Sequence, residues 1–407
     1  MGRFLMGVNR VMSTKKGIGA LFGEKLPGLF AILGNISVLT KMNTPIERYF
    51  SEVLKVKNQS LIDIIIQHFF KGTPAFFALG YLYLYPDYIY AQGGTGMLAV
   101  KIEEKARELG ITIKTSAKIR KVLPAEKTVI DEAGSCYAYD KLVWAADLKT
   151  LYRNVEEGKL PELVARSFKA EKDRILGHRG AESIFTLYAA VDEDPSYFAG
   201  ISSSHLFYTP SRQGLGSIIR EEQNYILEQW DSLSREAILA WLKRLVRYNT
   251  FEVAIPVLKT PAAAPPGKTG IIISFLFEYE IAKRARDAGW YEELKDRVSE
   301  YIISTISETL YKGFDRKILF TFAATPLSIE AMSGSSEGAV IGWSMEKPIP
   351  VTSSMLKMME AVKTSLPDVF KAGQWTMSPA GIPTAVMTGQ LAARAVSGKN
   401  RKQRGTA

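Results

Sequence analysis

The glycine-rich segment around residue 94 is the first place where this sequence could do chemistry. Gly94-Thr95-Gly96-Met97-Leu98-Ala99 fits the pattern G-x-G-x-x-A, which between a strand and a helix directs backbone N–H groups at the phosphates of a dinucleotide. A strand is expected over Tyr88–Tyr90 and a helix over Leu98–Leu109. The acid expected about 20 positions later to bind the ribose is absent, because that region reads Lys114-Thr115-Ser116-Ala117-Lys118. The motif alone is therefore a weak indicator of nucleotide binding.

A second group of candidate residues ends a short apolar strand. Val143-Trp144-Ala145-Ala146-Asp147 closes a strand expected over Lys141–Trp144, and small residues there allow a ligand to approach closely. Asp147 is the carboxylate that we would test first as catalytic, with a solvated surface position as the alternative. Further strands expected in this part of the chain, in a small sheet with hairpin-like connections, are Ile111–Thr115, Lys118–Leu123 and Thr128–Asp131.

Apolar and aromatic residues crowd into the first part of the chain. Residues 1–85 are expected to be helical, and the aromatic residues of interest are Phe69, Phe70, Phe76, Phe77 and Tyr81. Core packing is the commoner role of such a cluster. The alternative is the wall of a tunnel for a long apolar substrate.

The middle of the chain mixes strands and helices. The strands expected from alternation and apolar runs are Ser183–Val191, His205–Thr209, Phe251–Val257 and Gly270–Glu278, and the helices are Ser234–Tyr248 and Trp290–Leu310. A last helix is expected over Pro383–Val396, after a turn at Ser378-Pro379-Ala380-Gly381.

Composition limits the function classes. A chain of 407 residues with 46% apolar and 23% charged residues can bury a large core, and its length predicts about two domains. The single cysteine, Cys136, excludes a disulfide framework and a cysteine metal site, and it favours a reducing, cytoplasmic setting. The three histidines do not lie at metal-ligand spacing, so we predict no metal. No stretch has the length of about 18 apolar residues that a membrane-spanning helix requires.

The net charge of +10 is partly concentrated near the two ends of the chain. For residues 1–90, docking on an anionic membrane surface and simple solvation remain open as interpretations. For Lys399–Arg404 we favour a solvated tail. No recognition motif accompanies the charge, so we predict no nucleic-acid partner.

Several ordered segments together resemble one family of proteins. Tyr90–Met97 and the Val143–Asp147 segment look like the middle of phytoene desaturases, carotenoid isomerases and retinol saturases. The Pro-Gly loop at Pro256–Lys268, and Thr325-Pro326 followed by Glu337–Gly342, match in the same order. The strongest likeness is Ser378–Ala393, which is similar to the C-terminal flavin-contacting motif of the family.

The resemblance implies FAD as the cofactor, with its isoalloxazine near the last helix. The start of that helix would supply N–H groups and about half a positive charge, which stabilise negative charge on the N1–C2 side of reduced flavin. A plain turn before a helix is the alternative for this segment. The cofactor-binding residues implied in this way are Gly93, Gly94, Thr95, Gly96, Lys118, Ile119, Ala145, Ala146, Gly381, Ile382, Thr384 and Ala385.

The resemblance also implies the fold class and the domains. We expect an α/β protein with an FAD/NAD(P)-binding Rossmann-like domain, whose first βαβ unit is missing, and a mixed α+β substrate domain. The expected divisions are 1–85 (helical part of the substrate or membrane-facing domain), 86–150 (FAD domain, middle segment), 151–314 (substrate domain) and 315–407 (FAD domain, C-terminal segment). A separate dinucleotide-binding subunit is one source of the missing unit.

The function implied is an FAD-dependent oxidoreductase acting on CH–CH bonds of a lipophilic isoprenoid or polyene, by dehydrogenation, saturation or isomerisation. It would pass a hydride at flavin N5 and work in the cytoplasm or at the inner face of the membrane. Two rivals remain open. One is an amine oxidase-like flavoenzyme, and the other is a non-catalytic fragment or a subunit completed by a partner.

Overall fold

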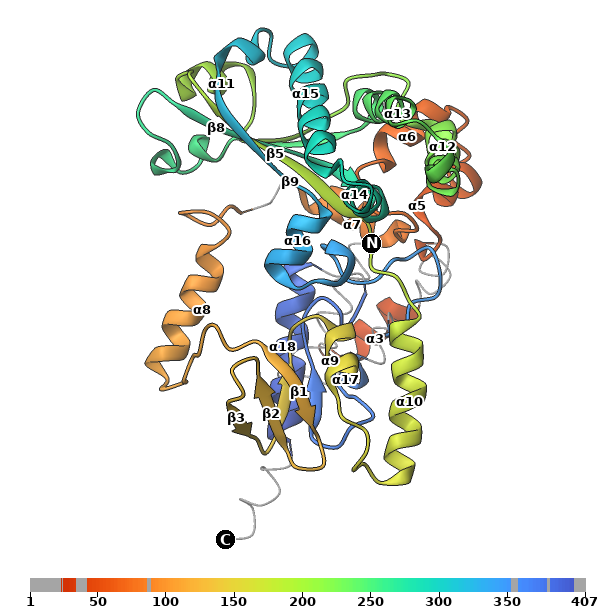
Figure 1. Ribbon diagram of the computed structural model, residues 1–407, viewed down its shortest axis with the longest axis vertical. Helices are drawn as coiled ribbons and strands as arrows, with labels where there is room; N and C mark the ends of the chain where they lie inside the picture. Colours follow the sequence, from red (N-terminus) through yellow and green to blue (C-terminus); the bar gives the residue numbers. More distant parts are fainter. Residues whose placement is uncertain are drawn as a thin grey trace.

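A sheet-and-helix part and a smaller part with two small sheets together make up the elongated molecule in Figure 1. The computed structural model describes residues 23, 25–33, 42–85, 89–352, 358–378 and 381–398. The chain passes between the two parts more than once, so each part combines segments that are distant in the sequence (Figure 1).

The larger part is built on a five-stranded antiparallel sheet with the order β6-β7-β8-β5-β9. Burial alternates regularly along β8, so one face of the strand lies in the core and the other is partly open. Ser183 at the start of β5 pairs with Phe277 at the end of β8, and Val191 pairs with Thr269. The strands are β5 Ser183–Val191, β6 His205–Tyr208, β7 Phe251–Ala254, β8 Thr269–Phe277 and β9 Ile318–Ala324.

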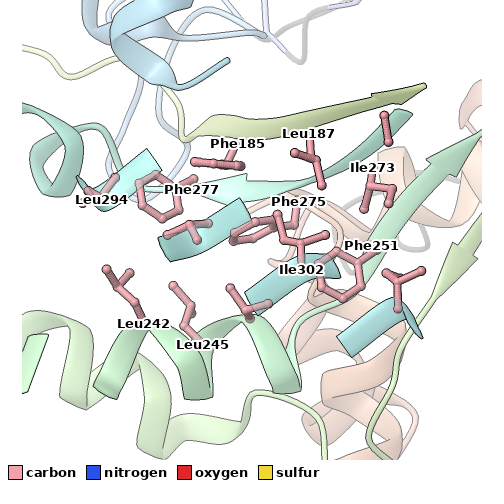
Figure 2. Close-up of a cluster of buried hydrophobic side chains, with 14 of the residues drawn as sticks. Phe185, Leu187, Leu242, Leu245, Phe251, Ile273, Phe275, Phe277, Leu294 and Ile302 are labelled. Atoms are coloured by element: carbon pink, nitrogen blue, oxygen red, sulfur yellow. The ribbon is translucent and has the colours of Figure 1, made fainter. Parts of the chain in front are cut away.

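Helices cover the buried face of this sheet and form the main core with it. Ser234 caps α13, because its side chain accepts a hydrogen bond from the backbone N–H of Ala237 at 3.2 Å. Figure 2 shows Phe275 and Ile273 of β8 between the neighbouring strand and the helices. The helices are α13 Arg235–Tyr248, α14 Tyr279–Asp287 and α15 Tyr291–Thr309.

The smaller part contains an antiparallel three-stranded sheet and a pair of parallel strands. Among the described strands, β4 pairs with β10 alone, and Val143 faces Phe370 in this register. A parallel sheet of two strands is unusual, because parallel sheets are normally buried between layers of helices. The elements are β1 Ile119–Leu123, β2 Thr128–Asp131, β3 Cys136–Ala138, β4 Leu142–Trp144, β10 Val369–Lys371, α9 Leu148–Asn154, α10 Glu162–Leu176 and α18 Ile382–Ser397.

A buried amide helps to attach the helices near the start of the described chain to the larger part. Gln67 donates to the carbonyl of Tyr248 at 3.0 Å and to Thr250 Oγ1 at 2.6 Å, and its Oε1 accepts from the N–H of Leu215 at 3.0 Å. These helices are α3 Leu26–Leu33, α5 Ile46–Arg48, a π-helical turn at Tyr49–Val53, α6 Gln59–Ile66 and α7 Ala75–Leu84. In the described ranges, none of the helices combines the length and the apolar character that crossing a membrane requires.

The remaining helices of the described chain are α8 Met97–Glu108, α11 Pro195–Ile201, α12 Gly216–Glu228, α16 Pro326–Ser333 and α17 Met358–Ala361. Short 3₁₀ turns occur at Trp230–Ser232, Pro256–Leu258, Pro261–Ala263, Phe314–Lys317 and Ser336–Gly338.

Two expected strands are absent where the structure describes them. Tyr88 lies outside the described residues, but Ile89 and Tyr90 are not in a strand, and neither is Ile111–Thr115. A strand requires a neighbour for its backbone groups, and no described strand pairs with either segment. The segment expected to belong wholly to the FAD domain, 315–407, in fact begins in the larger sheet, because β9 pairs with β5.

We predict that truncating the core of the larger part destabilises the protein strongly. Phe275→Ala removes a ring that is packed against Phe185, Phe251 and Phe277, which should lower the free energy of unfolding by about 3–5 kcal/mol. Denaturant unfolding followed by tryptophan fluorescence measures it. Leu163→Ala on the exposed side of α10 is the control, with an expected change within about 0.5 kcal/mol. Equal losses in the two variants would contradict the assigned core.

Candidate functional site

The carboxyl ends of β4 and β10 lie side by side and carry small residues. The N–H of Ala372 donates to the carbonyl of Trp144 at 2.9 Å, which keeps the two strand ends in register. Gly373 follows with a φ of +90°, and a Cβ at this position would lie 3.2 Å from the carbonyl oxygen of Ala145. Ala145 and Ala146 are exposed. Because α/β folds bind ligands at the carboxyl ends of parallel strands, this is the strongest candidate site in the described chain.

Helix α18 is attached to the same strand ends through its second turn. Thr388 Oγ1 accepts from the N–H of Gly373 at 2.9 Å and donates to the carbonyl of Ala385 at 2.9 Å. The helix begins at Ile382, after Gly381 with a φ of +148° that favours glycine. Of the sequence candidates, Ala145 lies beside Gly373, and Gly381 and Ile382 begin the helix that holds Gly373.

The details of α18 correct one expectation. The N–H of Ala385 bonds to the carbonyl of Gly381 at 2.9 Å, so it is already used within the helix and is not a free donor for a ligand. Pro383 has no N–H, so Gly381 and Ile382 are the backbone candidates at this helix end.

The residues at this site fit the ring end of a flavin. Small side chains at the strand ends leave space above the backbone, and the helix end favours negative charge. In addition, Thr376 Oγ1 is buried in the loop after Gly373 and has no hydrogen-bond partner among the described residues. A buried hydroxyl of this kind is costly unless it finds a partner, so the loop offers a further polar contact.

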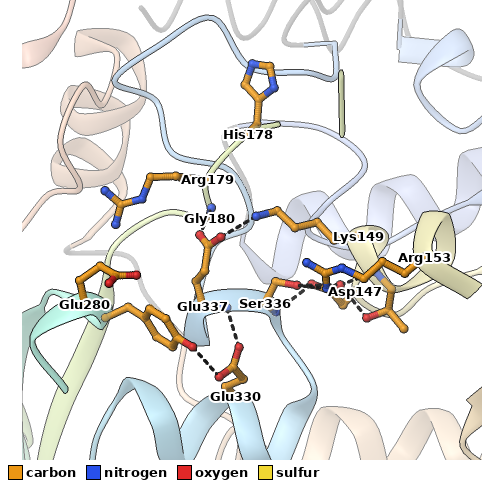
Figure 3. A network of polar contacts seen from close by, with 12 residues as sticks. Asp147, Lys149, Arg153, His178, Arg179, Gly180, Glu280, Glu330, Ser336 and Glu337 are labelled. Carbon is orange, nitrogen blue, oxygen red and sulfur yellow. Dashed lines mark hydrogen bonds and ion pairs between the residues drawn. The ribbon is translucent and has the colours of Figure 1, made fainter. Parts of the chain in front are cut away.

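Asp147 is held in a network of hydrogen bonds, so the solvated surface position expected as its alternative is wrong, while its catalytic role stays a prediction. It is buried, and Figure 3 shows its carboxylate facing Ser336. Oδ1 accepts from the N–H of Thr150 at 2.7 Å, which caps α9, and Oδ2 accepts from the N–H of Ser336 at 2.8 Å. The hydroxyls of Thr150 and Ser336 bond to Oδ1 as well. With hydrogen bonds to both oxygens, this buried carboxylate joins the start of α9 to the segment at Ser336.

A second acid, Glu337, continues the connection and was not predicted as a site residue. Its backbone is left-handed, with a φ of 61°, which is strained for a residue other than glycine. Its carboxylate accepts from the buried ammonium of Lys149 at 2.6 Å and from the N–H of Gly180. Its own N–H donates to Glu330 at 3.1 Å (Figure 3). Lys149 shows no sequence pattern that marks it as buried.

The remaining cofactor candidates do not meet at this site. Gly93 and Gly94 have positive φ values and form the turn before α8, where the N–H of Gly94 bonds to the carbonyl of Ala91 at 2.9 Å. Thr95 and Gly96 complete this turn, and α8 stands apart from α18 in Figure 1. Ile119 starts β1 and Lys118 precedes it, and their carbonyls accept from Asn154 Nδ2 and Glu132 N–H, respectively. Among the described residues, no hydrogen bond joins these candidates to the strand ends.

The aromatic residues of the first helices form a cluster that continues onto β6. Phe69 is buried and meets Tyr81 edge to face, with ring centroids 5.9 Å apart. His68 lies 4.6 Å from the Phe207 ring and 3.9 Å from the Phe69 ring. The burial of Phe69 agrees with the core-packing alternative. Phe70, Phe76 and Phe77 are half-buried, and the tunnel stays a prediction.

Next to this cluster lies a chain of three polar side chains that the sequence did not indicate. Tyr85 Oη lies 2.6 Å from His205 Nδ1, and His205 Nε2 lies 2.7 Å from Glu252 Oε1. The histidine comes from β6, the glutamate from β7, and the tyrosine from the end of α7. Such a chain can fix the tautomer of the imidazole. Tyr85 follows α7 and His205 begins β6. A single sequence does not show that these two segments lie next to each other.

Comparison with known proteins supports the fold. No family model matches the chain, and no curated protein matches its sequence. Among solved structures, putrescine oxidase bound to putrescine is similar with a TM-score of 0.51 and 11% identity, over 88% of this chain and 69% of that one. An oxidoreductase from Methanosarcina mazei gives a TM-score of 0.51 and 12% identity, over 88% of this chain and 71% of that one.

These likenesses confirm the predicted α/β fold class. They do not support the narrower resemblance to phytoene desaturases, and nothing in them indicates an isoprenoid.

We predict that Asp147→Ala lowers the free energy of unfolding by about 2–3 kcal/mol, because it leaves the N–H groups of Thr150 and Ser336 without their acceptor. Denaturant unfolding measures the loss. Asp296→Ala, which changes an exposed carboxylate on α15, should cost less than about 0.5 kcal/mol. An Asp147→Ala protein of unchanged stability would show that the link does not hold the two segments together.

We also predict that His68 makes stability depend on pH. Burial lowers the pKa of His68 to about 4 in the folded protein, whereas an unfolded histidine has a pKa of about 6.5. Between these values the unfolded chain binds a proton that the folded chain does not, so stability falls as pH falls from about 6.5 towards 4. From pH 7 to pH 5, the wild type should lose about 1–2 kcal/mol more than His68→Phe, which keeps a ring beside Phe207. Parallel pH profiles for the two proteins would refute the prediction.

Proposed function

We propose that this protein is part of an FAD-dependent oxidoreductase that passes a hydride between a substrate C–H bond and the flavin. The observation that carries the proposal is that the small residues Ala145 and Gly373 lie next to each other at the strand ends, where Thr388 of α18 holds Gly373. The fold shared with putrescine oxidase supports it. FAD, when bound, would supply N5 as the hydride acceptor or donor.

The residues of this chain would bind and orient the ring. Ala145 and Ala146 let the flat ring lie close to the strand ends, since larger side chains would hold it away. The N-terminus of α18 at Ile382 would stabilise negative charge on the pyrimidine side of the reduced ring, because the backbone dipoles are fixed in the fold and need no reorganisation. Thr388 holds Gly373, and through it the loop that carries Thr376, against the helix.

For the substrate we retain a lipophilic isoprenoid or polyene as the first candidate. Phe320 and Phe322 are exposed on β9, and Tyr188 of β5 stacks on Phe322 with centroids 4.4 Å apart. Large exposed aromatic groups often mark a binding surface. The apolar helices α3 and α7 agree with such a substrate and with contact at the inner membrane surface.

An amine is the second candidate substrate. The fold similarity to putrescine oxidase, which was solved with putrescine bound, favours it, and aromatic faces such as those of Tyr188 and Phe322 can attract a cation. Anaerobic mixing of the flavin-loaded protein with polyenes and with primary amines separates the two, since only a true substrate bleaches the flavin band.

We predict that Ala146→Leu weakens flavin binding by about tenfold or more without changing stability. The side chain would extend into space that the ring needs, while its exposed position avoids a clash within the protein. Titration of the purified chain with FAD, followed by flavin fluorescence, measures the affinity. Ala138→Leu on exposed β3 is the matched control. Equal affinities for the two variants would remove the strand ends from the flavin site.

A further inference from the structure

His178 lies on the stretch of chain that leaves α10 and enters β5, and both of its ring nitrogens face carbonyl oxygens. Nδ1 lies 2.6 Å from the carbonyl oxygen of Arg174, and Nε2 lies 3.0 Å from that of Pro348. A carbonyl oxygen only accepts hydrogen bonds, and a neutral imidazole has one N–H whereas an imidazolium has two. Only the protonated ring can therefore donate to both carbonyls. In the neutral ring, one nitrogen would turn its lone pair towards a carbonyl oxygen.

The last turn of α10 supplies one of these two acceptors. The backbone N–H of His178 bonds to the carbonyl of Ile175 at 3.4 Å, which leaves the carbonyl of Arg174 to the imidazole. Carbonyls in the last turn of a helix have no partner inside the helix, and together they carry about half a negative charge. The contact with Arg174 therefore suits a protonated ring as well as a neutral one. The contact with Pro348 needs the second proton.

The charged side chains around His178 do not satisfy its ring. Among the described residues, the two carbonyls are the hydrogen-bond partners of its nitrogens. Arg174 pairs with Glu171 at 3.9 Å. Arg179 pairs with Glu278 at 2.6 Å. The charge of a protonated ring is therefore balanced by carbonyl dipoles. The charged residues on the elements around the ring are Asp173 and Arg174 on α10, Arg179 next to it, Glu337 and Lys149 near Gly180, and Glu346 and Lys347 before Pro348.

The segment that ends at Pro348 packs against the same stretch of chain, which Figure 3 shows at His178 and Arg179. The N–H of Ser344 donates to the carbonyl of Arg179 at 3.1 Å. This bond holds the start of the segment. Pro348 lies beyond it and is exposed, so the bond to His178 extends the attachment to the end of the segment.

This segment also holds the loop of the strand-end site, which is the group of small residues at the ends of β4 and β10. The indole N–H of Trp343 donates to the carbonyl of Trp375 at 2.9 Å, and the two rings meet edge to face with centroids 4.7 Å apart. Trp375 lies between Gly373 and Thr376. A bond that stabilises the segment therefore also stabilises this loop.

We infer that His178 is a pH-sensitive switch that holds the loop of the strand-end site. The protonated ring donates to Arg174 and Pro348 together, and so joins the end of α10 to the segment that holds Trp375. The neutral ring keeps one of the two bonds, and the segment opens more often. An ordinary histidine changes its charge near pH 6.5, so mild acid closes the switch and mild alkali releases it. The effect on a flavin rests on the proposed function, whereas the switch itself does not.

Hydrogen exchange of the intact chain tests the switch at about pH 5.5 and about pH 7.5, on either side of the ordinary histidine pKa. The two reporters are the backbone N–H of Ser344 and the indole N–H of Trp343. Their protection factors are corrected for the intrinsic pH dependence of exchange. We expect both factors to be about tenfold higher at the lower pH, as a hydrogen bond from a charged donor predicts.

Variants show whether His178 is responsible. His178→Gln has no titrating group, so both protection factors should stay at the wild-type value for the higher pH. His178→Arg is always charged and has several donors, so it should keep the higher protection at both pH values. His205→Gln is the matched control, because it replaces another half-buried histidine and should retain the wild-type difference. Melting curves show whether each variant is folded, and either His178 variant alone decides the test.

Titration with FAD at the same two pH values tests the effect on the site. The wild type should bind FAD about threefold more tightly at the lower pH, because a loop that is already held costs less to order on binding. His178→Gln should bind FAD equally well at both.

Three outcomes would overturn the inference. They are protection that does not depend on pH in the wild type, a difference that His178→Gln retains, and a change at Ser344 without one at Trp343. An FAD affinity that is equal at both pH values would show that the switch does not act on the site. Protection that changes as expected in a chain that binds no FAD has a different meaning. It would leave the switch standing and refute the proposed flavin function.

Discussion

The connection between Asp147 and Ser336 is the contact on which the arrangement of this molecule depends. The two residues are 189 positions apart. Asp147 follows β4 in the smaller part. Ser336 comes after β9, the edge strand of the larger sheet, and after α16. A buried carboxylate is stable only when its oxygens are satisfied, and here four donors satisfy them. Burial of the charge therefore fixes both segments, with Glu337 and Lys149 extending the same link.

This link explains the position of the strand-end site. Because Asp147 is held by Ser336 and by the start of α9, the residues just before it, Ala145 and Ala146, are directed outward beside Gly373. Gly338 and Gly342 permit the close packing that this requires. A Cβ at Gly338 would lie 2.2 Å from the carbonyl oxygen of Pro326, and one at Gly342 would lie 2.6 Å from that of Gln374. The carboxylate of Asp147 thus supports the position of the site.

Local patterns predicted the elements whose pairing partners lie within the chain. Strand β5 has the predicted bounds, and α13 begins after Ser234 as expected, because alternation and capping are local signals. The segment Ile111–Thr115 has a strand-like sequence but no partner in the described chain, and a single sequence does not show a missing neighbour. Asp147 before α9 is a typical N-cap, yet its bond to Ser336 depends on tertiary structure. The burial of Lys149 and the left-handed Glu337 had no local signal either.

The short length of β4 has a consequence for the protein during synthesis and storage. An open strand edge is a template on which other chains can pair, and long, flat, apolar edges promote aggregation. Here the edge consists of Leu142–Trp144 alone, and it is followed at once by small residues and a helix. Three residues give too few backbone bonds for a persistent pairing with another strand of the same kind. This short edge is therefore a poor template for pairing with the strands of other chains.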